Sequence, residues 1–148
     1  TRDERIDASS ALRLAKECAQ GLQHVHSLGY MHRDIKSLNI LLTEDVHALV
    51  ADFGCCTAES KASDVVGTGQ WMAPEMLHNL FNADANEYDR RVDIYSYGVL
   101  LWELFHCKVP FYDMGWDQEE IAQKVLEEGA RPAVRGDCPP PPPALIHR

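Results

Sequence analysis

Apolar residues recur with the period of an α-helix in two long segments of the chain. Across residues 9–28 they fall on one helical face, and Gly29 follows the segment, so a helix is expected there. The apolar positions on this face are Leu12, Ala15, Cys18, Ala19, Leu22 and Val25. Across residues 92–105 the chain is apolar on nearly every side, which predicts a helix buried all round.

A third helix is expected to begin at Asp117. Glu120 stands three residues later and completes a capping box, in which each side chain accepts a hydrogen bond from the other residue's backbone N–H. The apolar residues that follow, Ile121, Val125 and Leu126, then face the interior.

Two short apolar runs predict a β-ribbon. Residues 40–42 and 47–50 are mostly apolar, and the residues 43–46 between them suit a tight connection. Pairing of the two strands would bring Asp52, just past the second run, back beside Asn39, just before the first. The expected fold class is therefore mainly α with a small β-ribbon.

Residues 76–91, which lead to the helix expected over residues 92–105, are longer and more polar than a usual connection. The polar residues among them are Asn79, Asn82, Asp84, Asn86 and Glu87. A tolerated surface loop is the favoured interpretation of this segment, and a docking insert is the alternative.

The composition is that of one compact domain. The 148 residues are 45% hydrophobic and 25% charged, which is enough for a single core. A formal net charge of −9 disfavours non-specific nucleic-acid binding. No apolar run approaches the length of a membrane span, and residues 1–5 are unlike a signal peptide, so a cytoplasmic protein is expected.

Cysteine usage agrees with an intracellular domain. The chain has five cysteines, an odd number without the paired spacing of a zinc site, which argues against a disulfide framework and against structural zinc. The adjacent Cys55 and Cys56 are expected to stay reduced.

The densest chemistry lies in residues 32–39, His-Arg-Asp-Ile-Lys-Ser-Leu-Asn, and in the Asp-Phe-Gly that begins at Asp52. Phosphoryl transfer needs positioned reactants and neutralised charge on the transferred group. Asp34 is a candidate proton acceptor, and Lys36 is a candidate cationic contact for phosphate. Asn39 and Asp52 carry the hard oxygen ligands that Mg²⁺ takes. A lone Asp is usually an ordinary loop carboxylate, but the ordered set favours the chemistry.

These two motifs, followed by Ala73-Pro74-Glu75, resemble the catalytic half of a eukaryotic protein kinase. The resemblance implies ATP and Mg²⁺ as cofactors and a protein as the phosphate acceptor. It gives catalytic roles to Asp34, Lys36, Asn39 and Asp52, of which Asn39 and Asp52 hold the metal and Lys36 contacts the nucleotide phosphate. Leu41 would pack under the adenine ring, with simple core packing as its alternative.

The resemblance also implies structural roles. Asp93 would accept backbone N–H bonds from the catalytic loop, and the alternative is that it caps its own helix. His32 and Phe53 would support the site. Glu75 would be buried in an ion pair with an arginine of a later C-terminal helix.

Residues 52–75 correspond to the activation segment of the resembling kinases. Thr57, Ser60 and Ser63 lie in its polar middle, and Arg33 directly precedes the proposed catalytic Asp34. We expect phosphorylation by an upstream activating kinase at Ser60 or Ser63, less so at Thr57, because a phosphate that pairs with Arg33 would order the segment. The alternative is that these are solvated loop hydroxyls.

The substrate class is indicated by Lys36 and Thr68. At both positions the chain resembles serine/threonine kinases, whereas tyrosine kinases generally have other residues there. Thr68 is expected to hydrogen-bond toward Asp34 and Lys36. Residues 71–75, 93–99 and 131–132 are similar to the tyrosine-kinase-like group, which includes Raf-like and mixed-lineage kinases. Cys55 is not the usual residue after Asp-Phe-Gly.

The resemblance covers residues 1–148 as a partial kinase domain. It includes the catalytic loop, the activation segment and the central helices, but not the glycine-rich loop, the paired Lys and Glu, or the last C-terminal helices. The expectation is the C-terminal lobe of the α+β bilobal kinase fold without its small lobe, and negligible activity for the isolated chain.

Other functions are weighed against this one. A non-catalytic scaffold or decoy binding module is the main alternative, and a small-molecule phosphotransferase is disfavoured by Thr68 and the long 52–75 segment. The proline run 139–143 is stiff and extended; it fits a lengthened Cys-Pro-Pro turn, or else a ligand for SH3 or WW modules.

Overall fold

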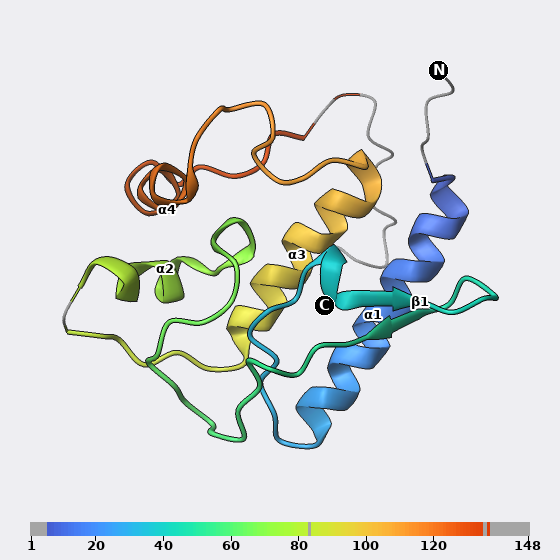
Figure 1. Cartoon of the computed structure of the whole chain (residues 1–148), viewed down its shortest axis with the longest axis horizontal. Helices are drawn as coiled ribbons and strands as arrows, with labels where there is room; N and C mark the ends of the chain where they lie inside the picture. Colours follow the sequence, from blue (N-terminus) through green and yellow to red (C-terminus); the bar gives the residue numbers. More distant parts are fainter. Residues whose placement is uncertain (1–5, 83, 135, 137–148) are drawn as a thin grey trace.

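Two long helices of the molecule pack against each other. The computed structural model describes residues 6–82, 84–134 and 136. In these residues α1 (Ala8–Ser27) packs against α3 (Arg91–His106) (Figure 1). The Tyr97 hydroxyl of α3 donates to the Ala15 carbonyl at 2.8 Å. One apolar core lies between α1, α3 and the ribbon, and a second lies where α2 and α4 meet. None of the described helices combines the length and apolar character needed to cross a membrane.

Helix α1 begins and ends where polar and glycine residues permit. The Asp7 side chain accepts a hydrogen bond from Ser10 N at 3.0 Å, and Gly29 follows the helix with φ +83°. The buried residues are Ala11, Leu14, Ala15, Cys18, Leu22 and Val25. Leu12 and Ala19, expected on the buried face, are only partly buried. At 100° per residue they lie at the edge of the face that meets α3 and β2.

The predicted β-ribbon is confirmed. Strand β1 (Ile40–Leu42) pairs antiparallel with β2 (Ala48–Val50), with Leu41 opposite Leu49. Thr43 and His47 close the connection, because Thr43 N donates to the His47 carbonyl at 2.9 Å. The ribbon projects across α1 in Figure 1, and β2 packs on that helix.

Helix α3 is not buried all round, contrary to the sequence-based expectation. Ile94 is 56% exposed, whereas three polar residues, Asp93, Ser96 and Glu103, are buried. The helix turns these polar side chains toward the loops that it supports, so its buried face is set by hydrogen bonds as well as by apolar packing.

The surface-loop expectation for residues 76–91 is wrong over its first part. Helix α2 (Pro74–Phe81) covers it, with Pro74 at a first-turn position where a missing N–H costs nothing. Asn79 is buried, and its side-chain amide is fully hydrogen-bonded there. The amide donates to the Ser63 and Asn86 carbonyls and accepts from Asn86 N. Its polar character reflects backbone groups that it satisfies, not exposure to solvent.

The predicted capping box is confirmed at the start of α4 (Gln118–Glu127). Glu120 N donates to Asp117 Oδ1 and Asp117 N to Glu120 Oε2, both at 2.9 Å. Ile121 and Val125 are buried against α2, and Leu126 is partly buried.

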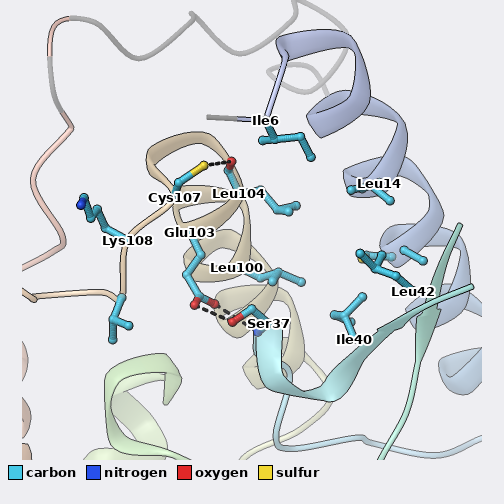
Figure 2. Close-up of a pocket in the computed structure, with 13 residues that line it drawn as sticks. Ile6, Leu14, Ser37, Ile40, Leu42, Leu100, Glu103, Leu104, Cys107 and Lys108 are labelled. Atoms are coloured by element: carbon cyan, nitrogen blue, oxygen red, sulfur yellow. Dashed lines mark hydrogen bonds between the residues drawn. The ribbon is translucent and has the colours of Figure 1, made fainter. Parts of the chain in front are cut away.

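A cavity of about 440 Å³ opens between α1, β1 and α3 (Figure 2). Its wall is mostly apolar, with Leu14, Leu42 and Leu100 among the lining residues. Polar groups lie at one side, where Ser37 approaches Glu103 of α3.

Candidate active site

Asp34, Lys36 and Thr68 form a closed triangle of hydrogen bonds. Lys36 Nζ lies 2.9 Å from Asp34 Oδ2 and donates to Thr68 Oγ1 at 2.6 Å. The Thr68 hydroxyl in turn donates to Asp34 Oδ1 at 2.8 Å. The chain thus brings together two loops that are more than thirty residues apart in sequence, as the expected Thr68 contacts required.

Asn39 fixes the same carboxylate from a third side. Its Nδ2 donates to the Asp34 carbonyl at 2.7 Å and to Asp34 Oδ2 at 2.9 Å. Burial raises the pKa of Asp34, but hydrogen bonds from Lys36, Thr68 and Asn39 outweigh burial and hold the pKa below its usual value. Asp34 is therefore a carboxylate at neutral pH, in a fixed orientation.

Asp93 anchors the backbone just before Asp34. Its two carboxylate oxygens accept from Arg33 N at 2.7 Å and from His32 N at 2.8 Å, and His26 Nε2 lies 2.7 Å from Oδ2. Asp93 is fully buried and lies inside α3, whose N-cap is Arg90, so the capping alternative is wrong. These bonds hold Arg33 at φ +68°, a conformation that costs a non-glycine residue roughly 1–3 kcal/mol.

His32 is a structural residue of the site. Its Nε2 lies 3.0 Å from the Ala51 carbonyl, which only accepts, so Nε2 carries the proton. Nδ1 then accepts from Asp34 N at 3.3 Å. The Phe53 ring lies 5.3 Å from the imidazole, centroid to centroid, and is itself 54% exposed.

The ribbon brings Asn39 and Asp52 together as expected. Ala51 N donates to the Asn39 carbonyl at 2.9 Å, which places the two residues at the same end of the strand pair. The Asp52 carboxylate is exposed and accepts from Gly54 N at 3.2 Å. An amide and a carboxylate from the same end of the strand pair fit the chemistry of Mg²⁺, which commonly takes one or two protein oxygens and fills its other positions with water and phosphate.

No described group of three or more His, Cys, Asp or Glu residues is arranged to hold a metal ion.

Leu41, next to the site on β1, is 58% exposed, so its alternative role as a core residue is wrong. An exposed leucine beside Asn39 offers an apolar surface at the edge of the site.

Comparison with known proteins identifies the family. A sequence profile of the protein kinase domain matches residues 1–139. The chain belongs to the protein kinase family. Serine/threonine/tyrosine-protein kinase HT1 of Arabidopsis thaliana is 37% identical over 145 residues, which are 96% of this chain and 34% of that protein.

Two relatives from Dictyostelium discoideum cover 86% of the chain. A probable LIM domain-containing serine/threonine-protein kinase is 36% identical over 132 residues, 19% of its own length. The dual specificity protein kinase pyk3 is 35% identical over 129 residues, 9% of its length. The chain therefore spans about a third or less of the length of these curated relatives.

In this kinase-family chain Arg33 already has an acidic partner. Its Nη1 donates to Asp64 Oδ1 at 2.6 Å and to the Tyr88 hydroxyl at 3.1 Å, and its Nε donates to the Cys55 carbonyl at 2.6 Å. Asp64 was not among the expected site residues, because nothing local distinguishes it from other acids of the segment.

None of the candidate phosphorylation sites takes part in the described hydrogen bonds of Arg33. Ser60 and Ser63 are exposed. Thr57 is partly buried, and its backbone pairs with Met31 through Thr57 N and the Thr57 carbonyl. Their place in regulation stays a prediction.

Glu75 is exposed in the described residues, and its burial in an ion pair with an arginine of a later helix stays a prediction. It lies in the first turn of α2, where a carboxylate faces the positive end of the helix. The described residues leave this side chain open to solvent.

Sequence reasoning missed Gly67 and Glu103. Gly67 has φ +100°, and a Cβ there would lie 2.5 Å from the Arg33 carbonyl oxygen. Only glycine at this position lets the two loops approach so closely. Glu103 is a buried acid in α3, and an acid within an otherwise apolar helix was the signal that could have found it. The proline run 139–143 lies outside the described residues.

Proposed function

We propose that the protein containing this chain is a serine/threonine kinase that transfers the γ-phosphoryl group of ATP to hydroxyls of protein substrates. The observation that carries the proposal is the Asp34–Lys36–Thr68 triangle, with Asn39 fixing Asp34 from behind. A base candidate and a cation lie within hydrogen-bond distance of one another, which is the positioning that phosphoryl transfer needs.

The reaction follows from these groups. A substrate hydroxyl placed at Asp34 forms a bond from its oxygen to the γ-phosphorus, while the bond from that phosphorus to the bridging oxygen breaks and ADP leaves. The hydroxyl proton passes to Asp34. Lys36 offsets charge on the transferred group. Asn39 and Asp52 would hold Mg²⁺, which when bound neutralises phosphate charge.

A fixed Asp34 suits orientation more than strong basicity. Its lowered pKa makes it a weak base. This is sufficient, because in a loose transition state the substrate hydroxyl gives up its proton to Asp34 only late in the transfer. The Lys36 and Thr68 contacts that lower the pKa also set the direction of the carboxylate.

Serine and threonine are the proposed acceptors because Lys36 and Thr68 match the residues of serine/threonine kinases at these positions, and both contact Asp34. The LIM domain-containing relative is named a serine/threonine-protein kinase, whereas HT1 is named a serine/threonine/tyrosine-protein kinase and pyk3 a dual specificity protein kinase. Membership of the tyrosine-kinase-like group and a cytoplasmic location are part of the same proposal.

We also propose that the described residues correspond to the C-terminal lobe of a bilobal kinase. The mainly helical architecture supports this, as do three exposed apolar side chains on or next to the ribbon: Leu41 at 58%, Leu49 at 53% and Phe53 at 54%. Adenine and a small lobe would cover such a surface, so the 148 residues alone should transfer phosphate negligibly.

An assay on the protein expressed from its complete transcript tests the function. It should phosphorylate Ser and Thr peptides from ATP, and phosphoamino-acid analysis should show little phosphotyrosine. The scaffold alternative is supported if the protein binds peptides but transfers no phosphate to any of them.

A further inference from the structure

Two adjacent cysteines, Cys55 and Cys56, follow the Asp-Phe-Gly residues at the start of the 52–75 segment. Both are free thiols, and both residues are partly exposed. They lie in a tight turn, because Cys56 N donates to the Phe53 carbonyl at 3.1 Å. Neither sulfur has a part in the proposed transfer reaction.

Both cysteines contact the catalytic loop just before its candidate base. The Cys55 carbonyl accepts a hydrogen bond from Arg33 Nε at 2.6 Å. The Cys56 thiol donates a weak hydrogen bond to the His32 carbonyl, with 3.8 Å between sulfur and oxygen. The two cysteines therefore lie at the junction between the 52–75 segment and the catalytic loop.

The Cys56 thiol is held in its protonated form. Burial raises the pKa of this thiol to about 11, and the proton is donated to the His32 carbonyl. A protonated thiol reacts slowly with peroxides, because the thiolate is the nucleophile. Cys55 is therefore expected to react first, and Cys56 stands next to it as the thiol that resolves the oxidised product.

The peptide bond between the two cysteines must move if their sulfurs join. Consecutive Cα atoms lie about 3.8 Å apart across a trans peptide, whereas the Cα atoms of a disulfide are usually at least about 4.4 Å apart. This peptide carries the Cys55 carbonyl that accepts from Arg33 and the Cys56 N–H that donates to Phe53. A disulfide would turn the peptide and disturb both hydrogen bonds.

We propose that Cys55 and Cys56 are an oxidation site for hydroperoxides, and that the disulfide they form breaks the bond between Arg33 and the 52–75 segment. The Cys55 sulfur attacks a peroxide oxygen, so that an S–O bond forms, the O–O bond breaks, and the oxygen that leaves takes the thiol proton. The Cys56 sulfur then attacks the Cys55 sulfur. An S–S bond forms, the S–O bond breaks, and water leaves with the Cys56 proton. Two thiols together lose two electrons, which reduce one peroxide.

The disulfide is expected to be reversible. A strained disulfide is reduced more readily than an unstrained one, so a dithiol reductant should restore both cysteines and the Arg33 contact. Given the proposed kinase function, oxidation should lower phosphate transfer, and reduction should restore it.

Mass spectrometry of the protein expressed from its complete transcript tests the chemistry. Trypsin releases both cysteines in residues 37–61, which contain no other cysteine. After treatment with hydrogen peroxide and then iodoacetamide, this peptide should be unalkylated and lighter by two hydrogens, and dithiothreitol should restore two alkylation sites. Cys56→Ser should stop at the sulfenic acid of Cys55, which dimedone captures.

Limited trypsin digestion of the folded protein tests the structural effect. Lys61 is an exposed cleavage site within the 52–75 segment. Oxidation should speed cleavage after Lys61 about threefold or more in the wild type and leave it unchanged in Cys56→Ser, which cannot form the disulfide. Cys107→Ser, at an exposed thiol at the end of α3, is the matched control and should behave as the wild type.

Three results overturn the inference, and each is visible in the wild type alone. The first is alkylation of both cysteines of residues 37–61 at every peroxide dose that leaves the protein folded. The second is their oxidation to sulfinic acid, or to disulfides with other cysteines. The third is a disulfide between Cys55 and Cys56 with an unchanged rate of cleavage after Lys61. These measurements need no catalysis, so a reduced wild type that transfers no phosphate would overturn the proposed function and not this inference.

Discussion

Arg33 and Asp64 form an ion pair of 2.6 Å between the catalytic loop and the segment of residues 52–75. The Arg33 side chain is 7% exposed and the Asp64 side chain is 56% exposed. Tyr88 joins the pair, because its hydroxyl lies 3.1 Å from Arg33 Nη1 and donates to the Asp64 carbonyl at 2.7 Å. Asp64, an acid of the segment, thus already pairs with the arginine to which a phosphate of the activated segment is expected to bind.

Replacing Asp64 should loosen the segment. In Asp64→Asn the Arg33 guanidinium loses its charged partner, so we expect cleavage within residues 52–75 by trypsin to be several times faster and stability to fall by about 1 kcal/mol. Limited proteolysis and urea unfolding measure the two effects. Asp84→Asn, at an exposed acid outside the pair, should match the wild type. Equal cleavage rates in all three proteins would show that the pair does not order the segment.

Phosphorylation of the segment should compete with Asp64 for Arg33. A phosphate on Ser63, beside Asp64 in sequence, or on Ser60 would compete for Arg33 with a larger charge than a carboxylate carries. We expect Ser60→Ala with Ser63→Ala to lower the activity of protein isolated from cells, and to lower it further in the Asp64→Asn background. Phosphopeptide mapping of active protein is the check, and an unmodified 52–75 segment would contradict the prediction.

Gly67 should tolerate no side chain. Gly67→Ala places a Cβ at φ +100° and 2.5 Å from the Arg33 carbonyl oxygen, so the loop must move or strain by roughly 1–3 kcal/mol. Gly98→Ala is a matched control, because Gly98 lies within α3 with open space around its Cβ position. Alanine there should be neutral or stabilise by about 0.5–1 kcal/mol. Equal unfolding free energies for the two variants would contradict this account of the loop.

The lowered pKa of Asp34 predicts a pH dependence of stability. The folded state holds this group as a carboxylate, so its contribution is present above the usual aspartate pKa of about 3.9 and is lost as pH falls through the lower folded value. The difference in unfolding free energy between wild type and Asp34→Asn should therefore be constant near neutral pH and shrink in acid. Urea unfolding across pH measures it. A difference that grows in acid would show the opposite sign of shift.

Local patterns predicted much of the site. The order of residues 32–39 and 52–54 indicated which residues would be neighbours, and two short apolar runs predicted the ribbon that joins their ends. The capping box at Asp117 was likewise a short-range signal. In each case the determining contacts lie within a few residues, or within one strand pair.

What the sequence did not predict depends on contacts between distant segments. Asp64 and Glu103 acquire their partners only when loops more than thirty residues apart meet on α3 or at Arg33. Asn79 looked like a loop residue because its partners, the Ser63 and Asn86 backbones, are set by the fold.

The most direct test of the kinase proposal is the initial rate of γ-phosphoryl transfer to a Ser peptide by the protein expressed from its complete transcript, compared among the wild type, Asp34→Asn and Asp45→Asn. Asp45 is an exposed acid in the ribbon connection and serves as the control. The proposal predicts a peptide-dependent rate that falls roughly a hundredfold or more in Asp34→Asn and is unchanged in Asp45→Asn. An equal rate in the wild type and Asp34→Asn, or no transfer by the wild type, would contradict it.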